Sequence, residues 1–314
     1  MANKRCTQIV FPSLFARQAS RPGQDEQASV PTVPEPIAVI PTTADKVRSH
    51  RRGPAHVAGA SSLTRFPIRV DDKIVRASPW ETYSEGFALR LGPDFRITVA
   101  QPKNSSSGGG KVTFRELGGA KAVEQLRMLQ RIRHANFVSV LRIFQHNHTF
   151  HVMSEYMPVS LEEIARSRRR VGKVELADIL GQLVDGLTYL SAQCLSHGSL
   201  RAATVLVNEQ GEVKIAASEK CTVNATEHPR SPDVEAFTGI VAKLMREEVT
   251  ETGIVRVTGP DMWDEDVLKF VSKTTAATSM EELVDDPLLQ SPRRLWQLQE
   301  LVSITIYSAR FHLY

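Results

Sequence analysis

The chain has 314 residues, 41% of them hydrophobic and 24% charged, which is typical of a globular protein with enough apolar material for a sizeable core. The net charge of +4 is a mild basic excess, whereas nucleic-acid-binding proteins usually carry a concentrated basic face, so the sequence does not indicate nucleic-acid binding. No apolar run approaches the roughly 20 residues of a membrane span. Three widely spaced cysteines favour a reduced compartment, so we expect a cytoplasmic protein, with a nuclear location as the alternative.

The first 60 residues predict a disordered, basic arm. Four prolines punctuate residues 31–41, and apolar periodicity is missing throughout the segment. Arg48, Arg51 and Arg52 form either a nuclear-import patch or a solvated run of charge.

Short runs with strand-like composition follow and predict a β-rich unit over residues 61–154. Turn residues separate these runs. A helix over 120–133 interrupts them, because Val123, Leu126, Leu129 and Ile132 recur on one face. The predicted strands are 66–70, 87–91, 95–101, 111–117, 138–144 and 150–156.

From residue 155 the pattern becomes helical. Ser160 and Glu163 form a capping box, in which two side chains satisfy free backbone N–H groups at a helix start. The clearest amphipathic stripe covers 176–190. Two short strands at 204–208 and 213–217 follow, and then helices at 233–246, 267–271 and 279–284. The tail 291–314 is amphipathic, and it either packs on the body or binds a partner.

Several segments in this order resemble the eukaryotic protein kinase family, over about residues 80–290. LQRIRHANFV (129–138) is similar to the segment that leaves helix C, VMSEYM (152–157) to the strand 5–hinge run, and the stripe 176–190 to helix E. SHGSLRAATVLVNEQGEVKIAAS (196–218) is similar to the catalytic loop and the metal-binding motif. DVEAFTGIVAKLM (233–245) resembles helix F, and SMEELVDDPLLQ (279–290) the helix that closes the helical lobe.

The resemblance implies an α+β, bilobal protein-kinase-like fold. Its β-rich lobe covers 61–154, its mainly helical lobe covers 155–290, and a C-terminal amphipathic tail covers 291–314. Residues 217–233 hold the activation segment, which is much shorter than is usual in the family and lacks the Ala-Pro-Glu motif. The Arg that normally pairs with that motif matches Ala277. Both partners of one buried ion pair are therefore missing, which leaves no unpaired charge.

The positions that would carry phosphoryl transfer hold the wrong side chains. In this family a catalytic Asp accepts the substrate proton, an Asn and an Asp bind magnesium, and a strand-3 Lys pairs with a helix-C Glu. No Gly-rich loop is recognisable near residues 84–87. Ser199 stands at the position of the catalytic Asp, Arg201 at that of the Lys two residues on, and Thr204 at that of the Asn. Ala217 stands at the position of the metal-binding Asp. Arg115 matches the strand-3 Lys, and Gln125 matches the helix-C Glu.

These substitutions predict a pseudokinase that acts as a scaffold or allosteric partner of other proteins, an active kinase among the candidates. We expect no catalytic residues, no metal and no cofactor. The alternative is residual ATP binding with serine/threonine kinase activity, in a vestigial nucleotide cleft formed by Arg115, Glu155, Met157 and Thr204. The resemblance gives His197 a structural role, in which its imidazole holds the backbone of the loop.

Overall fold

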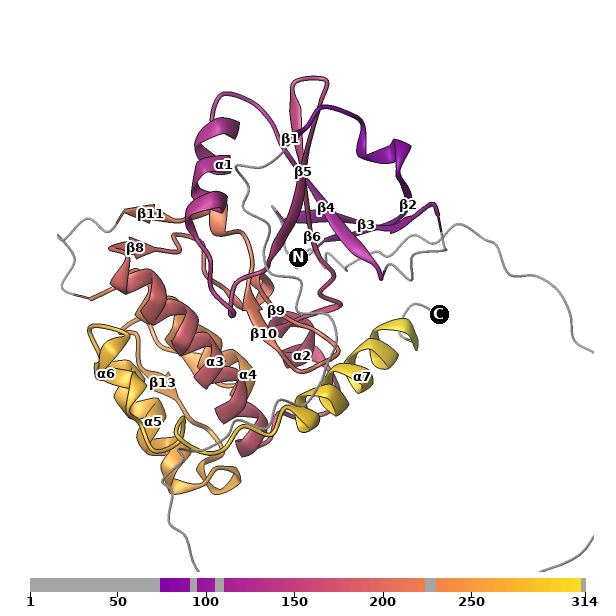
Figure 1. The fold of residues 1–314 in the computed structure, drawn as a ribbon. Helices are drawn as coiled ribbons and strands as arrows, with labels where there is room; N and C mark the ends of the chain where they lie inside the picture. The colour runs from indigo at the N-terminus through magenta and orange to yellow at the C-terminus, as the bar shows by residue number, and fades with distance from the viewer. Residues whose placement is uncertain (1–73, 91–94, 105–109, 224–229, 312–314) are drawn as a thin grey trace, which may run out of the picture. The chain divides into compact units, whose positions relative to one another are not determined.

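A computed structural model describes residues 74–90, 95–104, 110–223 and 230–311 (Figure 1). The predicted arm 1–60 and the predicted strand 66–70 lie outside this set. The described residues all belong to one compact unit, and none of their helices is long and apolar enough to cross a membrane. A β-rich lobe precedes a helical lobe along the chain, which confirms the predicted two-lobed α+β architecture.

The first lobe is a six-stranded sheet in the order β1-β5-β6-β4-β3-β2. All neighbouring strands are antiparallel except β1, which pairs in parallel with β5. The strand bounds are β1 Ile74–Val75, β2 Tyr83–Arg90, β3 Arg96–Pro102, β4 Val112–Leu117, β5 Val140–His146 and β6 Thr149–Glu155. Residues 84–87, where the family resemblance would place a Gly-rich loop, lie inside β2 at a β-bulge and form no loop.

The two faces of this sheet are covered by different parts of the chain. On one face Trp80, from the short helix η2 (Pro79–Glu81), and Tyr83 pack on Phe114 and Phe144, with ring centroids 5.1–6.3 Å apart. Helix α1 (Ala122–Arg131) packs on the other face through Ala122 and Leu126. Val123 was expected on the buried face of this helix, but it is 51% exposed.

The second lobe is built around helix α3 (Lys173–Ala192), whose apolar stripe is completely buried. The predicted capping box is present at α2, where Glu163 N–H donates to Ser160 Oγ (3.3 Å) and Ser160 N–H donates to Glu163 Oε2 (2.8 Å). The other helices are α2 Leu161–Arg166, α4 Pro232–Met245, α5 Glu265–Ala276 and α6 Glu281–Val284. The short strands are β7 Val159–Ser160, β8 Leu195–Ser196, β9 Val205–Val207, β10 Val213–Ile215, β11 Thr222–Val223, β12 Glu248–Val249 and β13 Val255–Arg256.

The C-terminal tail forms helix α7 (Leu295–Phe311), which packs on the helical lobe against α2, α3 and β7. Leu298, Leu301 and Val302 join the core of that lobe. At the turn between β9 and β10, Gly211 has a positive φ of 80°, and a Cβ there would lie 2.5 Å from the Leu295 carbonyl oxygen. Of the two alternatives for the tail, the structure has it packed on the body.

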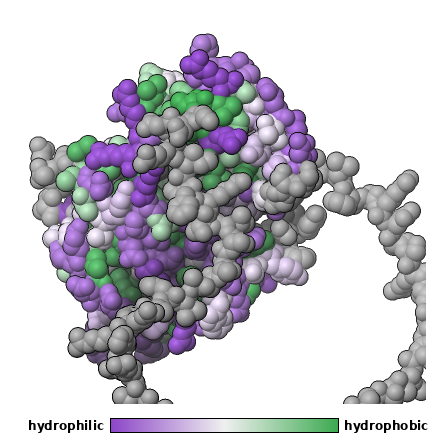
Figure 2. Space-filling model, in the orientation of Figure 1, coloured by the Kyte–Doolittle hydropathy of each residue, from purple (hydrophilic) through white to green (hydrophobic). Residues whose placement is uncertain are grey.

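The described surface carries few large apolar side chains. On the face drawn in Figure 2, hydrophobic residues gather most visibly at the top, over the sheet lobe, and hydrophilic residues surround them. Burial of the remaining apolar side chains in four clusters supplies the main driving force for this fold.

Candidate functional site

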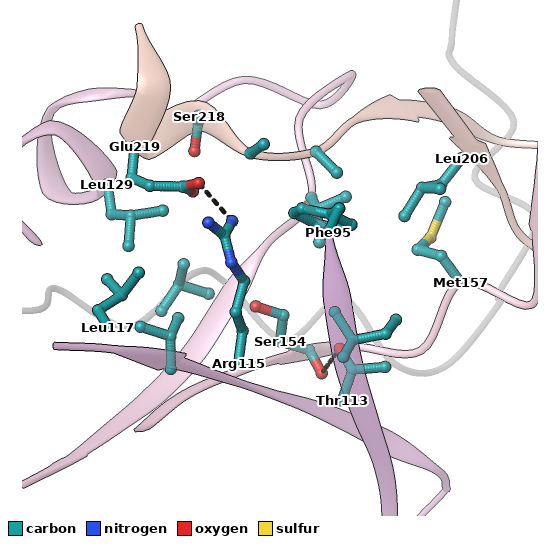
Figure 3. A pocket seen from close by; sticks show the side chains of 16 residues that line it. Phe95, Thr113, Arg115, Leu117, Leu129, Ser154, Met157, Leu206, Ser218 and Glu219 are labelled. Atoms are coloured by element: carbon teal, nitrogen blue, oxygen red, sulfur yellow. Dashed lines mark hydrogen bonds and ion pairs between the residues drawn. The ribbon is translucent and has the colours of Figure 1, made fainter. Parts of the chain in front are cut away.

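A small cavity lies between the sheet and the helical lobe, at the place where the resemblance puts a nucleotide. Strand alternation places Thr113, Arg115 and Leu117 of β4 on the face of the sheet that lines the cavity. Its volume is about 50 Å³, whereas pockets for small ligands usually hold about 300 Å³ or more. The lining residues are Phe95, Ile97, Thr113, Arg115, Leu117, Leu129, Val138, Val140, Val152, Ser154, Met157, Leu206 and 216–219 (Figure 3).

Apolar side chains from both lobes fill most of this interlobe space. Phe95, at the start of β3, is only 4% exposed and packs between the lobes in one cluster with Met157 and Leu206. The full cluster is Leu89, Phe95, Ile97, Val99, Met157, Leu206, Ala216 and Ala217. The apolar part of the cleft is therefore packed like a protein core, and it includes the flat aromatic ring of Phe95.

One ion pair spans the remaining polar part of the cavity. The guanidinium group of Arg115 pairs with the carboxylate of Glu219, and Figure 3 shows the two side chains meeting across the cavity. The Glu219 side chain is 2% exposed and that of Arg115 is 18% exposed. Arg115 also lies 4.6 Å from the centroid of the Phe95 ring, within cation–π range. Arg115 thus pairs with Glu219 of helix η5 (Ser218–Lys220), and its ion pair does not involve Gln125 of α1.

The four residues proposed for a vestigial nucleotide cleft do not meet in one place. Arg115 and Met157 line the cavity. Glu155 does not line it, because its carboxylate receives hydrogen bonds from Lys214 Nζ (2.8 Å) and from the Ser139 N–H (2.7 Å). Thr204 does not line it either. Its hydroxyl donates to the Arg201 carbonyl (3.0 Å) and accepts from the Arg201 N–H (3.1 Å).

The side chains near the cavity do not fit a magnesium–nucleotide complex. Ala217, at the position of the metal-binding Asp, contributes only a methyl group to the lining. The one carboxylate that lines the cavity, Glu219, is already paired with Arg115. Within the described ranges, no group of three or more His, Cys, Asp or Glu side chains is placed to hold a metal ion. Magnesium needs free oxygen ligands, and this arrangement offers none from a carboxylate.

The loop at His197 keeps its backbone scaffold. The His197 N–H donates to both carboxylate oxygens of Asp233 in α4 (3.1 and 2.9 Å). The His197 Nε2 atom lies 2.8 Å from the Ala216 carbonyl oxygen. The hydroxyl of Ser199 is buried and makes no hydrogen bond within the described part of the chain. The loop is therefore held in place, but no base contacts the hydroxyl that stands at the catalytic position.

The segment after Ala217 is anchored in a different way from the family pattern. Residues 222–223 pair with β8, and residues 224–229 lie outside the described set. Arg230 then donates to the Thr274 carbonyl (2.9 Å) and to the Thr238 hydroxyl (3.0 Å). Ala277 lies in the apolar core. Hydrogen bonds from Arg230 thus attach this segment to α4 and α5.

The contributions of His197 and Asp233 to the stability of the fold should change with pH in opposite directions. Burial lowers the pKa of His197 from 6.5 to about 4 and raises that of Asp233 from 3.8 to about 6. Between pH 4 and 6.5 the unfolded chain binds more protons at His197 than the native chain does, so this residue lowers stability as pH falls. Between pH 4 and 6 the native chain binds more protons at Asp233, so this residue lowers stability as pH rises.

Replacing His197 should separate the two contributions. In His197→Gln the amide can still donate to Ala216, but the proton-linked loss of stability in acid disappears. We expect the variant to gain roughly 3 kcal/mol relative to the wild type between pH 7 and pH 4. Urea denaturation over this pH range measures the difference, and His146→Gln, at a half-buried histidine of β5, is the control. A constant difference between wild type and His197→Gln across the range would contradict the prediction.

Comparison with known proteins agrees with this architecture. Residues 111–218 match the family described as protein kinase domain. The chain is 27% identical over 96 residues to a probable serine/threonine-protein kinase, CCRP1, of Zea mays, and 30% identical over 95 residues to serine/threonine-protein kinase TAO1-A of Xenopus laevis. It is 27% identical over 133 residues to human mitogen-activated protein kinase 12.

These alignments are partial in both directions. They cover 30%, 30% and 38% of this chain, and 15%, 10% and 36% of the respective relatives. The family match includes most residues that line the cavity, from Thr113 of β4 to Ser218, whereas Phe95, Ile97 and Glu219 lie outside it. Residues 111–218 therefore carry the pattern of the protein kinase domain family.

Proposed function

We propose that this chain is a catalytically inactive member of its family, a pseudokinase that acts through protein contacts as a scaffold or allosteric partner. The observation that carries the proposal is the occupied cleft. Phe95 and the Arg115–Glu219 ion pair take up the space and the charge that a nucleotide would need. A chain that uses its own side chains in this way no longer depends on a nucleotide to connect its lobes.

The chemistry at the loop supports the same proposal. Proton transfer to a catalytic group needs a base whose pKa is near the working pH. Ser199 has a hydroxyl in place of a carboxylate, and nothing in the described structure activates it. Without a metal-binding carboxylate at Ala217, charge on a transferring phosphoryl group would also lack its usual counter-ion.

Nucleotide titration tests the occupied cleft. With ATP at about 5 mM, with or without magnesium, we expect the melting temperature to move by less than about 1 °C. A ligand at 100 times its Kd stabilises by about 2.7 kcal/mol, which would move it by several degrees. Glu219→Ala is the matched variant, because it frees Arg115 for an anion. A wild-type shift that grows with ATP concentration would revive the alternative of residual nucleotide binding.

Phosphate transfer tests inactivity directly. We expect no labelled phosphate on the chain or on generic protein substrates after incubation with magnesium and labelled ATP. The matched control is Ser199→Ala, which should behave like the wild type. Transfer by the wild type that Ser199→Ala abolishes would show residual serine/threonine kinase activity, and the chain would then be an enzyme.

A protein partner is the remaining part of the proposal, and an active kinase is one candidate. The chain should be tagged, expressed at its natural level and cross-linked in intact cells before fractionation. We expect a defined partner to co-elute with it in the cytoplasmic or nuclear fraction. Elution as a free monomer from both fractions would contradict a scaffold function.

A further inference from the structure

The sequence contains three Ser-Pro dipeptides, and their local structures differ. They are Ser78-Pro79, Ser231-Pro232 and Ser291-Pro292. A protein kinase that acts on serine followed by proline would find the same two-residue signal at each. Such an enzyme must take the serine and its neighbours into its own cleft, so it needs an exposed segment with few hydrogen bonds to break. Structure therefore decides which of the three can be a substrate.

Two of the three serines are held within the fold. The Ser78 hydroxyl accepts the Trp80 N–H (3.3 Å) in a complete capping box, and Pro79 is buried. Ser231 is half-buried at the start of α4, where its N–H donates to the Thr278 carbonyl (2.9 Å). Its carbonyl accepts the Val234 N–H (3.0 Å). Reaching either hydroxyl would require local unfolding of a packed element.

The third serine lies in the irregular segment that connects α6 to α7. Residues 291–294 are all exposed and belong to no helix or strand. No hydrogen bond of Ser291 occurs within the described residues, and Pro292 favours an extended backbone at the residue before it. We propose that Ser291 is a phosphorylation site for a serine/threonine kinase that recognises serine followed by proline.

The neighbouring charges suit the modified side chain. Arg293 and Arg294 follow within three residues, and a phosphoserine accepts strong hydrogen bonds from guanidinium groups. Arg293 at present pairs with Asp185 of α3 (2.5 Å) and lies above Gly181, where a Cβ would be 3.7 Å from its guanidinium. A dianionic phosphate beside Arg293 would compete with Asp185 for that group.

The reaction needs only the second kinase and its usual co-substrate. The Ser291 Oγ–P bond forms as the bond between the β- and γ-phosphates of ATP breaks. The hydroxyl proton passes to the catalytic base of that kinase, and ADP leaves. Ser291 can be modified by the second kinase whether or not this chain has activity of its own.

The test uses the full chain, a purified proline-directed serine/threonine kinase and magnesium–ATP, with site assignment by mass spectrometry. We expect Ser291 to be modified at least about tenfold faster than Ser78 or Ser231, since about 1.4 kcal/mol of local opening already gives that factor. Ser291→Ala and Pro292→Ala should abolish most of the incorporation, whereas Ser231→Ala should leave it unchanged.

Two results would overturn the proposal. One is an unmodified Ser291 under conditions in which the same kinase phosphorylates a reference Ser-Pro peptide. The other is equal modification of the three serines, which would mean that the folded structure does not select among them. A parallel reaction without the added kinase reports on the chain's own activity, so failure of the proposed inactivity would be seen separately.

Discussion

Arg115→Met should destabilise the protein by roughly 3–5 kcal/mol, because it leaves the carboxylate of Glu219 buried without its counter-ion. The Glu219 side chain is 2% exposed, so water cannot replace the lost guanidinium without rearrangement of η5. Methionine fills a similar volume to the arginine stem, which separates loss of charge from loss of packing. The change in unfolding free energy is measured by urea denaturation at pH 7 and moderate salt.

A double-mutant cycle gives this prediction its control. Glu219→Leu should cost less than Arg115→Met, because Arg115 is 18% exposed and can still reach water. The double variant Arg115→Met/Glu219→Leu should recover most of the loss and come within about 1 kcal/mol of the wild type, since it leaves no buried charge unpaired. Arg142→Met, on the exposed side of β5, should change stability by less than about 0.5 kcal/mol. Additive effects of Arg115→Met and Glu219→Leu would mean that the two groups do not interact.

Local sequence patterns predicted most of the fold because the elements that matter obey local rules. The stripe 176–190 repeats at the helical period, and it became the buried face of α3. Ser160 and Glu163 satisfy each other's backbone groups within four residues, so the capping box needs no tertiary partner to be recognised. The strands were found where β-branched and aromatic residues alternate, with ends displaced by a residue or more, as at β2.

The cleft was less predictable, because its contacts join residues far apart in sequence. Arg115 and Glu219 are brought together only when β4 and η5 face the same cavity. Glu219 stands two residues after Ala217, and the sequence alone gives it no function. One signal in the sequence could have indicated the ion pair. Glu219 stands where the family's Asp-Phe-Gly motif has its glycine, and the strand-3 position holds an arginine in place of the lysine. In the same way Glu155 turns toward Lys214, which no local pattern reveals.

Retained and altered contacts separate the structural part of the family's loop from its chemical part. The hydrogen bonds from His197 to Asp233 and to Ala216 tie the loop to α4 and to the segment after β10. Those bonds hold backbone in place whether or not a phosphoryl group is transferred. Ser199 and Ala217 occupy the two positions at which the family has a catalytic and a metal-binding Asp. Those carboxylates serve only the chemistry on the nucleotide. A fold under selection for stability and binding alone would keep the first set and lose the second.

Helix α7 has a structural function, because its apolar side chains complete the core of the helical lobe, and Leu301→Ala should demonstrate this function. Leu301 is 0% exposed in the core of the helical lobe, and removing a buried leucine costs about 2–5 kcal/mol. If the tail folds as one unit with the body, the loss appears in the single unfolding transition of the lobe. Denaturation followed by far-ultraviolet circular dichroism measures it.

Trp296→Ala is the matched control on the same helix. Trp296 is larger than Leu301 but 59% exposed, so its removal should change the unfolding free energy by less than about 0.5 kcal/mol. Burial predicts a much larger loss of unfolding free energy for Leu301→Ala than for Trp296→Ala. Side-chain size alone would predict the reverse. Small and equal effects of the two substitutions would instead mean that α7 detaches before the lobe unfolds. In that case the tail would be available to bind a partner, which is the alternative to packing on the body.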